Sequence, residues 1–189
     1  MLRDISLHIM DLSQNSIRAE AKMVRISLVA EDGFLNVSIE DNGLGMDKDY
    51  LKKVEDPFTT ERTTRKVGMG IPFFKQACLT AEGDFSLQSE LNQGTTIKGS
   101  FMIKSIDRIP LGDIGETIKY LIINDENIRY ILDVKKDCNE FQFDTDVIKE
   151  TLEGVPINQQ EILEWIKEYI NDNVSNIFGG VLDEIPGRT

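Results

Sequence analysis

Apolar residues near the start of the chain recur at the spacing of an α-helix, so the first predicted element is a helix over residues 4–21. At about 100° per residue, one stripe of this helix holds Ile5, Ile9, Leu12, Ser16 and Ala19. A second stripe holds His8, Asp11, Asn15 and Arg18. By itself the second stripe is typical of a solvent-exposed helix face, although Asp11 and Asn15 are poor helix formers and set a carboxylate and an amide one turn apart.

Apolar and polar residues then alternate on both sides of Asp32-Gly33, which predicts a β-hairpin whose second strand ends at Asp41. The next residues, DNGLGM over 41–46, break the strand with two glycines. A turn would explain one glycine, but it does not require a pair spaced by one residue behind an aspartate. A short helix is predicted over 48–54.

Further along the chain, the pattern predicts a helix over 71–81 that ends before Gly83. Strands over 85–89 and 95–103 flank the turn Asn92-Gln93-Gly94. This half of the chain therefore runs helix, strand, strand, helix, loop, helix, strand, strand.

The second half begins after a link around Pro110 and Gly112. Its pattern predicts a helix over 113–124, a β-hairpin over 127–145 and helices over 146–153 and 158–173. In the last helix, apolar residues recur at helical spacing with Trp165 close by; they are Ile162, Leu163, Ile166, Tyr169 and Ile170. This stripe suits packing against the hairpin or against a partner.

Composition fits a globular protein of 189 residues, 40% of them hydrophobic, built as one domain with a large extension or as two small domains. The net charge of −12 is uneven. Residues 1–104 carry 13 Lys and Arg against 15 Asp and Glu, a net −2, whereas residues 105–189 carry 8 against 18, a net −10. The acidic second half argues against a nucleic-acid partner and suggests two units with different roles.

Several other classes of protein are disfavoured. The chain has no apolar run long enough for a membrane helix and no signal-peptide pattern at its start, so we expect a cytoplasmic protein without a membrane association. Cys78 and Cys138 are isolated, and with His8 as the single histidine they make a disulfide framework or a zinc site improbable.

The loop before the helix at 71 carries a concentration of groups that suit a phosphate. It reads FTTERTTRKVGMGIPFF over 58–74 and supplies hydroxyls and cations from Thr59, Thr60, Arg62, Arg65 and Lys66. Gly68, Met69 and Gly70 then lead into the helix, whose start offers unpaired N–H groups. The alternative interpretations are an ordinary loop end and a solvated run of charges.

Four short motifs together resemble a known family. Asp11-x-x-x-Asn15, Asp41-x-Gly43-x-Gly45, Gly68-x-Gly70 and Gly94-Thr95 occur in the order of the four boxes of the gyrase, heat-shock chaperone, histidine kinase and MutL ATPase superfamily. The resemblance covers about residues 1–104. The loop PFTTERTTRKVGMGI is most similar to that of bacterial anti-sigma-factor serine kinases.

This resemblance implies a fold. It is an α/β fold, more closely an α+β two-layer sandwich, in which helices cover one face of a mixed sheet. In this fold ATP lies between the helical layer and a mobile lid. Residues 1–104 would form this histidine-kinase-like ATP-binding domain. Residues 105–189 would form a small acidic α+β domain of unknown role. The composition of residues 57–67, rich in threonine and charge, favours a lid that only ligand contacts could order.

The resemblance also implies roles around the adenine base. Asp41 would accept a hydrogen bond from the adenine amino group, and Gly43 and Gly45 would let the backbone pass the base edge. Met46 would pack on the ring. Thr95 would make a second adenine contact, with Thr96 as the alternative after a slip of one residue.

Other residues would face the phosphates. Asn15 would be the ligand of a magnesium ion, and Asp11 stands where ATP-hydrolysing members place a glutamate that acts as general base. Aspartate is one methylene shorter, so Asp11 is either that base or a residue that orients water around the metal. His8 either tunes Asp11 or is an ordinary structural residue. Lys66 stands where the anti-sigma kinases have an arginine that contacts the terminal phosphate, with Arg65 as the alternative.

Three functions follow from this resemblance. The first is a magnesium-dependent phosphotransferase that acts on a partner protein, the phosphoacceptor. The second is a switch in which ATP hydrolysis drives dimerisation. The third is a binding module in which ATP only exposes a surface for a partner. Homodimerisation is left open by the sequence.

Overall fold

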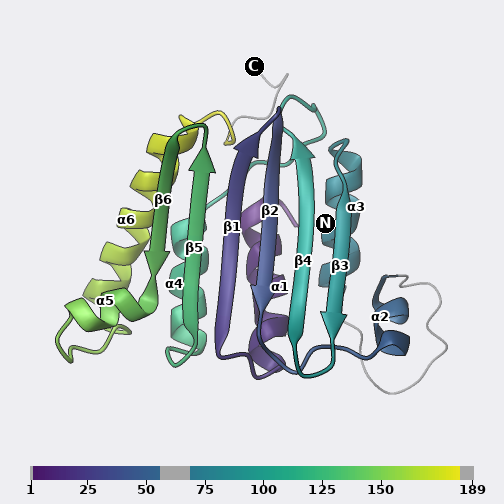
Figure 1. Cartoon of the computed structure of the whole chain (residues 1–189). Helices are drawn as coiled ribbons and strands as arrows, with labels where there is room; N and C mark the ends of the chain where they lie inside the picture. Colours follow the sequence, from purple (N-terminus) through teal and green to yellow (C-terminus); the bar gives the residue numbers. More distant parts are fainter. Residues whose placement is uncertain (1, 56–68, 184–189) are drawn as a thin grey trace.

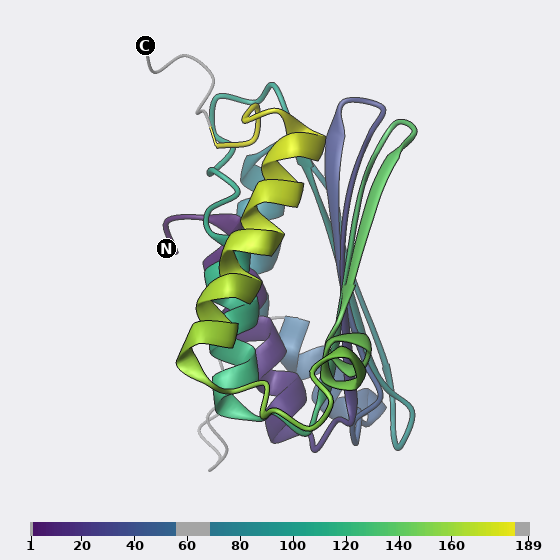
Figure 2. The same cartoon turned by 90° about the vertical axis from the view of Figure 1, so that its left-hand side faces the viewer.

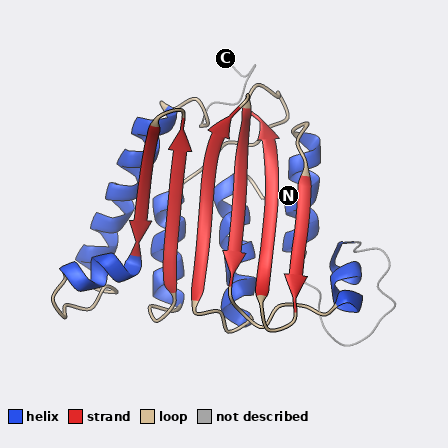
Figure 3. Cartoon of the chain, in the orientation of Figure 1, coloured by secondary structure: helices blue, strands red, loops and turns tan. Residues whose placement is uncertain are grey.

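One mixed sheet organises the chain, and its strands lie in the order β3-β4-β2-β1-β5-β6 (Figure 1). The computed structural model describes residues 2–55 and 69–183. The strands are β1 (Met23–Glu31), β2 (Phe34–Asp41), β3 (Phe85–Glu90), β4 (Gly94–Met102), β5 (Arg129–Lys136) and β6 (Asn139–Asp144). The helices are α1 (Ile5–Arg18), α2 (Lys48–Glu55), α3 (Gly70–Thr80), α4 (Ile114–Asn124), α5 (Thr145–Thr151) and α6 (Gln160–Phe178) (Figure 3).

Helices α1, α3, α4 and α6 lie together on one face of the sheet (Figure 2). The burial of β1 alternates along the strand, so Val24, Ile26 and Leu28 face the helices and are buried, whereas Arg25 and Ser27 face away from them. The predicted mixed sheet with helices on one face is therefore confirmed. Among the described residues, no helix is both long and apolar enough to cross a membrane.

The first elements form where local chemistry predicts them. Asp4 caps α1 by accepting a hydrogen bond from the Leu7 N–H at 2.9 Å, so the helix begins at Ile5. Asp32 and Gly33 both have positive φ, 50° and 83°, and this two-residue turn brings β1 and β2 into antiparallel register. The hairpin prediction is confirmed.

The last helix extends beyond its predicted end. Instead of stopping at residue 173, α6 continues to Phe178, because Val174 and Phe178 prolong its buried stripe. Gly179 ends it in the left-handed conformation with φ 68°.

Residues 105–183 extend the same sheet as the first half. β5 pairs in parallel with β1, and β6 pairs with β5 to form one edge of the sheet. In β5, Tyr130, Ile131 and Leu132 are consecutive and all buried, which suits a strand covered on both faces better than the surface of a small separate sheet. The described part of the second half thus shares one sheet and one apolar core with the first, rather than building a sheet of its own.

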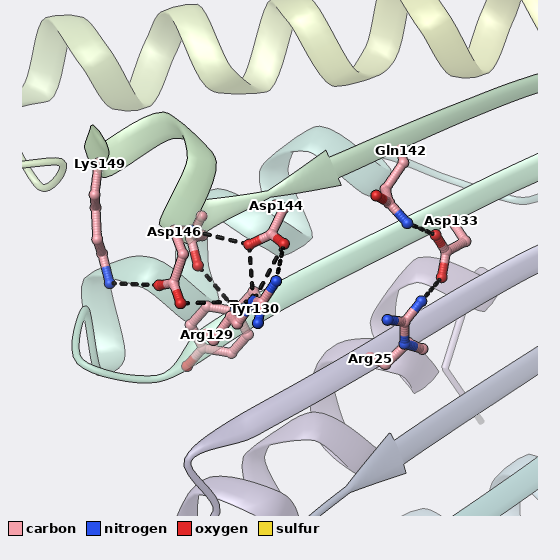
Figure 4. Close-up of polar contacts among 9 residues, drawn as sticks. Arg25, Arg129, Tyr130, Asp133, Gln142, Asp144, Asp146 and Lys149 are labelled. Carbon is pink, nitrogen blue, oxygen red and sulfur yellow. Dashed lines mark hydrogen bonds and ion pairs between the residues drawn. The ribbon is translucent and has the colours of Figure 1, made fainter. Parts of the chain in front are cut away.

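Charged contacts join these strands on the face away from the four helices (Figure 4). Arg25 of β1 donates to Asp133 of β5 at 2.6 Å, and Gln142 of β6 donates to the same carboxylate at 2.6 Å. Arg129 binds Asp144 at 2.5 Å, where β6 passes into α5. These contacts tie β5 to both of its neighbours.

The buried guanidinium of Arg108 holds the end of the described chain in place through hydrogen bonds. Arg108, in the connection between β4 and α4, donates to four backbone carbonyls at 2.8–3.2 Å, those of Ile103, Ile109, Val181 and Leu182. Burial lowers the pKa of Arg108. The residues that follow α6 are thereby held against the connection between the two halves.

Candidate functional site

A cavity of about 670 Å³ opens between α1, the loop after β2, α2 and the β3–β4 turn. Its volume is that of a small-molecule site. Five residues predicted to bind the nucleotide line it: Asn15, Asp41, Gly45, Met46 and Thr95. A smaller cavity of about 290 Å³, between the start of α4 and the end of α6, contains none of the predicted residues.

Asp41, at the end of β2, is held by two hydrogen bonds. Its Oδ2 accepts from the Ser16 hydroxyl at 2.7 Å, and its Oδ1 accepts from the Gly43 N–H at 2.9 Å. An ionised carboxylate offers about four acceptor positions, so these two bonds fix its orientation and leave capacity for a donor on a ligand in the cavity. Asp41 is thus a positioned acceptor.

Ser89, on β3, joins the two loops that border the cavity. Its hydroxyl accepts from the Met46 N–H at 2.8 Å, donates to the Gly94 carbonyl at 2.9 Å and lies 2.9 Å from the Thr95 hydroxyl. Thr95 lines the cavity, whereas Thr96 falls on the opposite face of β4 because side chains alternate along a strand. The structure therefore brings Thr95 to the cavity and not its alternative.

Ser16 and Ser89 were not singled out from the sequence, although a signal was present for each. Ser16 is a polar residue on the apolar stripe of the first helix, and it is buried. Ser89 stands at an inward position of its strand, two residues after the buried Leu87. A polar side chain on a buried stripe needs a hydrogen-bond partner, and here that partner belongs to the cavity.

Glycines allow the loop after β2 to lie against the β3–β4 turn. Gly45 has φ +63°, and a Cβ there would collide with the Glu90 carbonyl. Gly94 has φ +102°, and a Cβ there would collide with the Asp41 carbonyl. At Gly45 and Gly94 the glycines thus allow two segments of the chain to approach each other closely.

On α1, Asp11 and Asn15 have different surroundings. Asn15 lines the cavity, and its Oδ1 accepts a long hydrogen bond from Arg18 at 3.4 Å. Asp11 lies against Gly70, the first residue of α3, where a Cβ would collide with the Asp11 carboxylate. Met69, just before α3, is 48% exposed. Asp11 and Gly70 therefore meet at the α1–α3 junction, and the following residue, Ile71, lines the cavity.

The remaining predicted phosphate ligands lie outside the described residues. They are Thr59, Thr60, Arg62, Arg65, Lys66 and Gly68.

His8 is fully buried one turn before Asp11. Its ring lies 5.9 Å from the ring of Phe74, and neither of its nitrogens has a hydrogen-bond partner among residues 2–55 and 69–183. Burial lowers the pKa of His8, while the charges of Asp11 and Asp4 oppose that change. His8 thus packs as an uncharged ring behind the site.

The described residues could contribute little to a metal site on their own. No group of three or more His, Cys, Asp or Glu side chains among them could hold a metal ion. Asn15 offers one neutral oxygen at the cavity wall. Such a donor fits a magnesium ion that takes its other ligands from phosphates and water, and it does not fit a metal held by protein alone.

Comparison with known proteins gives the class of this fold: an ATP-binding domain. Residues 3–104 match the family model described as histidine kinase-, DNA gyrase B-, and HSP90-like ATPase. The chain belongs to this family. The resemblance inferred from the four motifs is confirmed, and the matched residues contain β1 to β4 and the cavity.

Among individual relatives, the autoinducer 2 sensor kinase/phosphatase LuxQ of Vibrio parahaemolyticus serotype O3:K6 (strain RIMD 2210633) is 26% identical over 168 residues, which is 80% of this chain and 19% of that protein. The sensor protein RprX of Bacteroides fragilis (strain YCH46) is 32% identical over 96 residues, 46% of this chain and 18% of that protein. The chain thus spans about a fifth of the length of these relatives.

The fold itself recurs in a solved structure. The N-terminal domain of a DNA repair protein superposes with a TM-score of 0.50 at 14% identity, over 75% of this chain and 52% of that one. At this identity the match shows a shared fold.

Proposed function

We propose that this chain binds ATP together with magnesium in the 670 Å³ cavity and acts as a phosphotransferase or regulator on a partner protein. The observation that carries the proposal is the Asp41 carboxylate, fixed by Ser16 and Gly43 in the cavity that Thr95 also lines. A fixed acceptor beside a hydroxyl suits the edge of an adenine base, which presents an amino donor next to a ring acceptor.

The predicted residues in and beside the cavity then have separate roles. Asp41 accepts from the adenine amino group, Thr95 makes the second base contact, and Met46 packs on the ring. Asn15 is the protein ligand of the magnesium ion, which neutralises phosphate charge when bound. Asp11, which lies on α1 against the first residue of α3, orients water near the phosphates or removes its proton.

The phosphotransferase part of the proposal rests on relatives whose names are sensor kinases. In this proposal the phosphoacceptor is a partner protein. Recovery of partners from the native cell with ATP present, followed by mapping of transferred phosphate, would identify it. If no recovered protein carries phosphate from the added ATP, the transferase role is wrong while ATP binding still stands.

The first prediction tests ATP binding. Asp41→Asn replaces one acceptor oxygen by a donor, so we expect ATP affinity to fall by about 5- to 150-fold, the equivalent of about 1–3 kcal/mol for a lost buried hydrogen bond. Calorimetric titration measures it. Asp32→Asn makes the same exchange in the exposed turn at the far end of β2 and should bind like the wild type. Removal of magnesium with EDTA should also weaken binding. Equal affinity in Asp41→Asn and wild type would refute the assignment of the cavity.

A second candidate function is a nucleotide-gated binding module that does not turn ATP over. It is favoured by the position of Asp11, whose carboxylate lies against Gly70 and is not among the residues that line the cavity. Measurement of ADP release under multiple turnover separates the two functions. A protein that holds ATP for hours without forming ADP or labelled partner is such a module.

A further inference from the structure

The outer face of α6 carries a pair of stacked aromatic rings. Trp165 and Tyr169 lie one turn apart with ring centroids at 5.1 Å and an angle of 7° between their planes. Phe141 of β6 meets Tyr169 edge-on at 5.4 Å. Trp165 is nevertheless 50% exposed and Tyr169 39% exposed. In Figure 2, α6 crosses the front of the molecule, and no other helix or strand is drawn in front of it.

The fold does not need these two rings to hold α6 in place. A different stripe of the helix faces the core, and its residues are all buried: Leu163, Ile166, Ile170, Val174 and Phe178. Large aromatic side chains that stay in solvent beside a complete core stripe mark an interaction surface more often than a structural need.

Acidic side chains surround the aromatic pair. Glu161, Glu168 and Asp172 are exposed and lie four residues before, three after and seven after Trp165, so they share its face of the helix. None of the three forms an ion pair with a described residue. The cations near α6 are engaged on its inner flank, where Lys119 binds Glu164 at 2.7 Å and Lys167 binds Glu116 at 2.8 Å.

We propose that this face of α6, defined by Glu161, Trp165, Glu168, Tyr169 and Asp172, docks a segment of a partner protein rich in arginine or lysine. Cations stack favourably on the faces of tryptophan and tyrosine, and the carboxylates around them match the charge of such a segment. The same face of a second copy of the chain would present the same negative charge, and nucleic acids and anionic lipids would be repelled. The occupant that fits is therefore a basic peptide.

This surface lies outside residues 3–104, which match the family model, so the proposal does not rest on the proposed nucleotide binding. It assigns a role to the acidic second half of the chain. The segment that extends the sheet also carries the surface through which a partner is recognised.

The test uses the intrinsic fluorescence of Trp165, the single tryptophan of the sequence. A short oligoarginine peptide without aromatic residues is titrated into the full chain. We expect a saturable change in Trp165 emission that weakens as salt rises, because exposed charge pairs are screened. An oligoglutamate peptide of the same length should cause no change.

Two variants test which residues are responsible. The triple substitution Glu161→Gln, Glu168→Gln and Asp172→Asn should weaken binding at least about 3-fold. A control triple substitution, Glu31→Gln, Glu82→Gln and Asp84→Asn, changes the net charge equally at exposed positions elsewhere and should bind like the wild type. Tyr169→Leu keeps an apolar contact with Phe141 but removes the π face, and should weaken binding about 2- to 5-fold.

Three results would overturn the proposal. The first is no saturable change with oligoarginine, and the second is an equal change with oligoglutamate. The third is equal weakening by the two triple substitutions, because attraction between a protein of net charge −12 and any polycation would then explain the binding.

Discussion

Two inward-facing serines hold the candidate site together at the scale of single residues. Ser16 fixes Asp41 from α1, and Ser89 fixes Met46, Gly94 and Thr95 from β3. Neither serine was predicted to touch a nucleotide. Both act by setting the position of groups that line the cavity.

Ser89→Ala should therefore weaken ATP binding without changing the fold. The Met46 N–H would lose its acceptor and the Thr95 hydroxyl would be free to rotate, so we expect about a 2- to 12-fold loss of affinity, the equivalent of about 0.5–1.5 kcal/mol. Calorimetry measures this loss. Ser86→Ala, at an exposed position of the same strand, is the matched control. Unchanged affinity in Ser89→Ala, with ATP still bound by the wild type, would show that these hydrogen bonds do not organise the site.

His8 gives the protein a pH dependence that can be isolated. Its pKa in the folded chain lies below its ordinary value of 6.5 because burial disfavours the charged ring. Below about pH 6.5 the unfolded chain then binds a proton more readily than the folded chain, so the free energy of unfolding falls as pH decreases. His8→Phe should flatten this decline between about pH 6.5 and 5. Urea unfolding across that range checks it, and an equal slope in both proteins would contradict it.

At the scale of elements, α5 depends on one residue with two functions. Asp144 caps the helix by accepting from the Asp146 N–H at 3.0 Å, and it pairs with Arg129 of β5. The hydrogen bond from Arg129 is the largest cause that holds the pKa of Asp144 below its ordinary value of 3.8. Burial of the carboxyl group acts in the opposite direction, and the hydrogen bond from the Asp146 N–H also lowers the pKa. The stabilisation is therefore present above about pH 3.8 and is lost as pH falls below that value.

Asp144→Ala should destabilise the protein by about 0.5–2 kcal/mol through loss of the cap, which lowers Tm by about 1–8 °C. Asp144→Asn keeps an acceptor for the cap and loses only the charge. Because Arg129 is 46% exposed, that pair is screened by solvent and should contribute less than the cap. Thermal unfolding at neutral pH should give the highest Tm for the wild type, a lower Tm for Asp144→Asn and the lowest for Asp144→Ala. Equal stability of the Asn and Ala variants would show that the ion pair, not the cap, holds α5.

At the scale of the whole molecule, the pairing of β1 with β5 decides whether residues 1–104 can fold without the second half of the chain. Truncation after residue 104 would expose the β1 edge that pairs with β5 and the face of α1 that packs against α4, whose Ile118 and Leu121 are fully buried. We expect the truncated chain to aggregate or to lose cooperative unfolding. Circular dichroism with thermal unfolding and size-exclusion chromatography measure this. A cooperative transition near the Tm of the full chain would instead make residue 104 the boundary of an independent domain.

The sequence by itself determined the features that depend on neighbouring residues. The Asp32-Gly33 turn and the apolar stripe of α1 are local, and their chemistry is readable because turn geometry and helical periodicity act over a few residues. The order of the four motifs identified the family, since each motif lies in or next to an element that the sequence pattern predicts.

Only the tertiary structure decided how these elements meet. The residues of β1 and β5 pair across more than a hundred positions of sequence, and a strand's local pattern shows that it has a buried face without showing which strand lies beside it. The partners of Ser16 and Ser89 were hidden for the same reason. Each serine bonds to a group on another segment, and only the packing of α1 and β3 against the end of β2 brings donor and acceptor together.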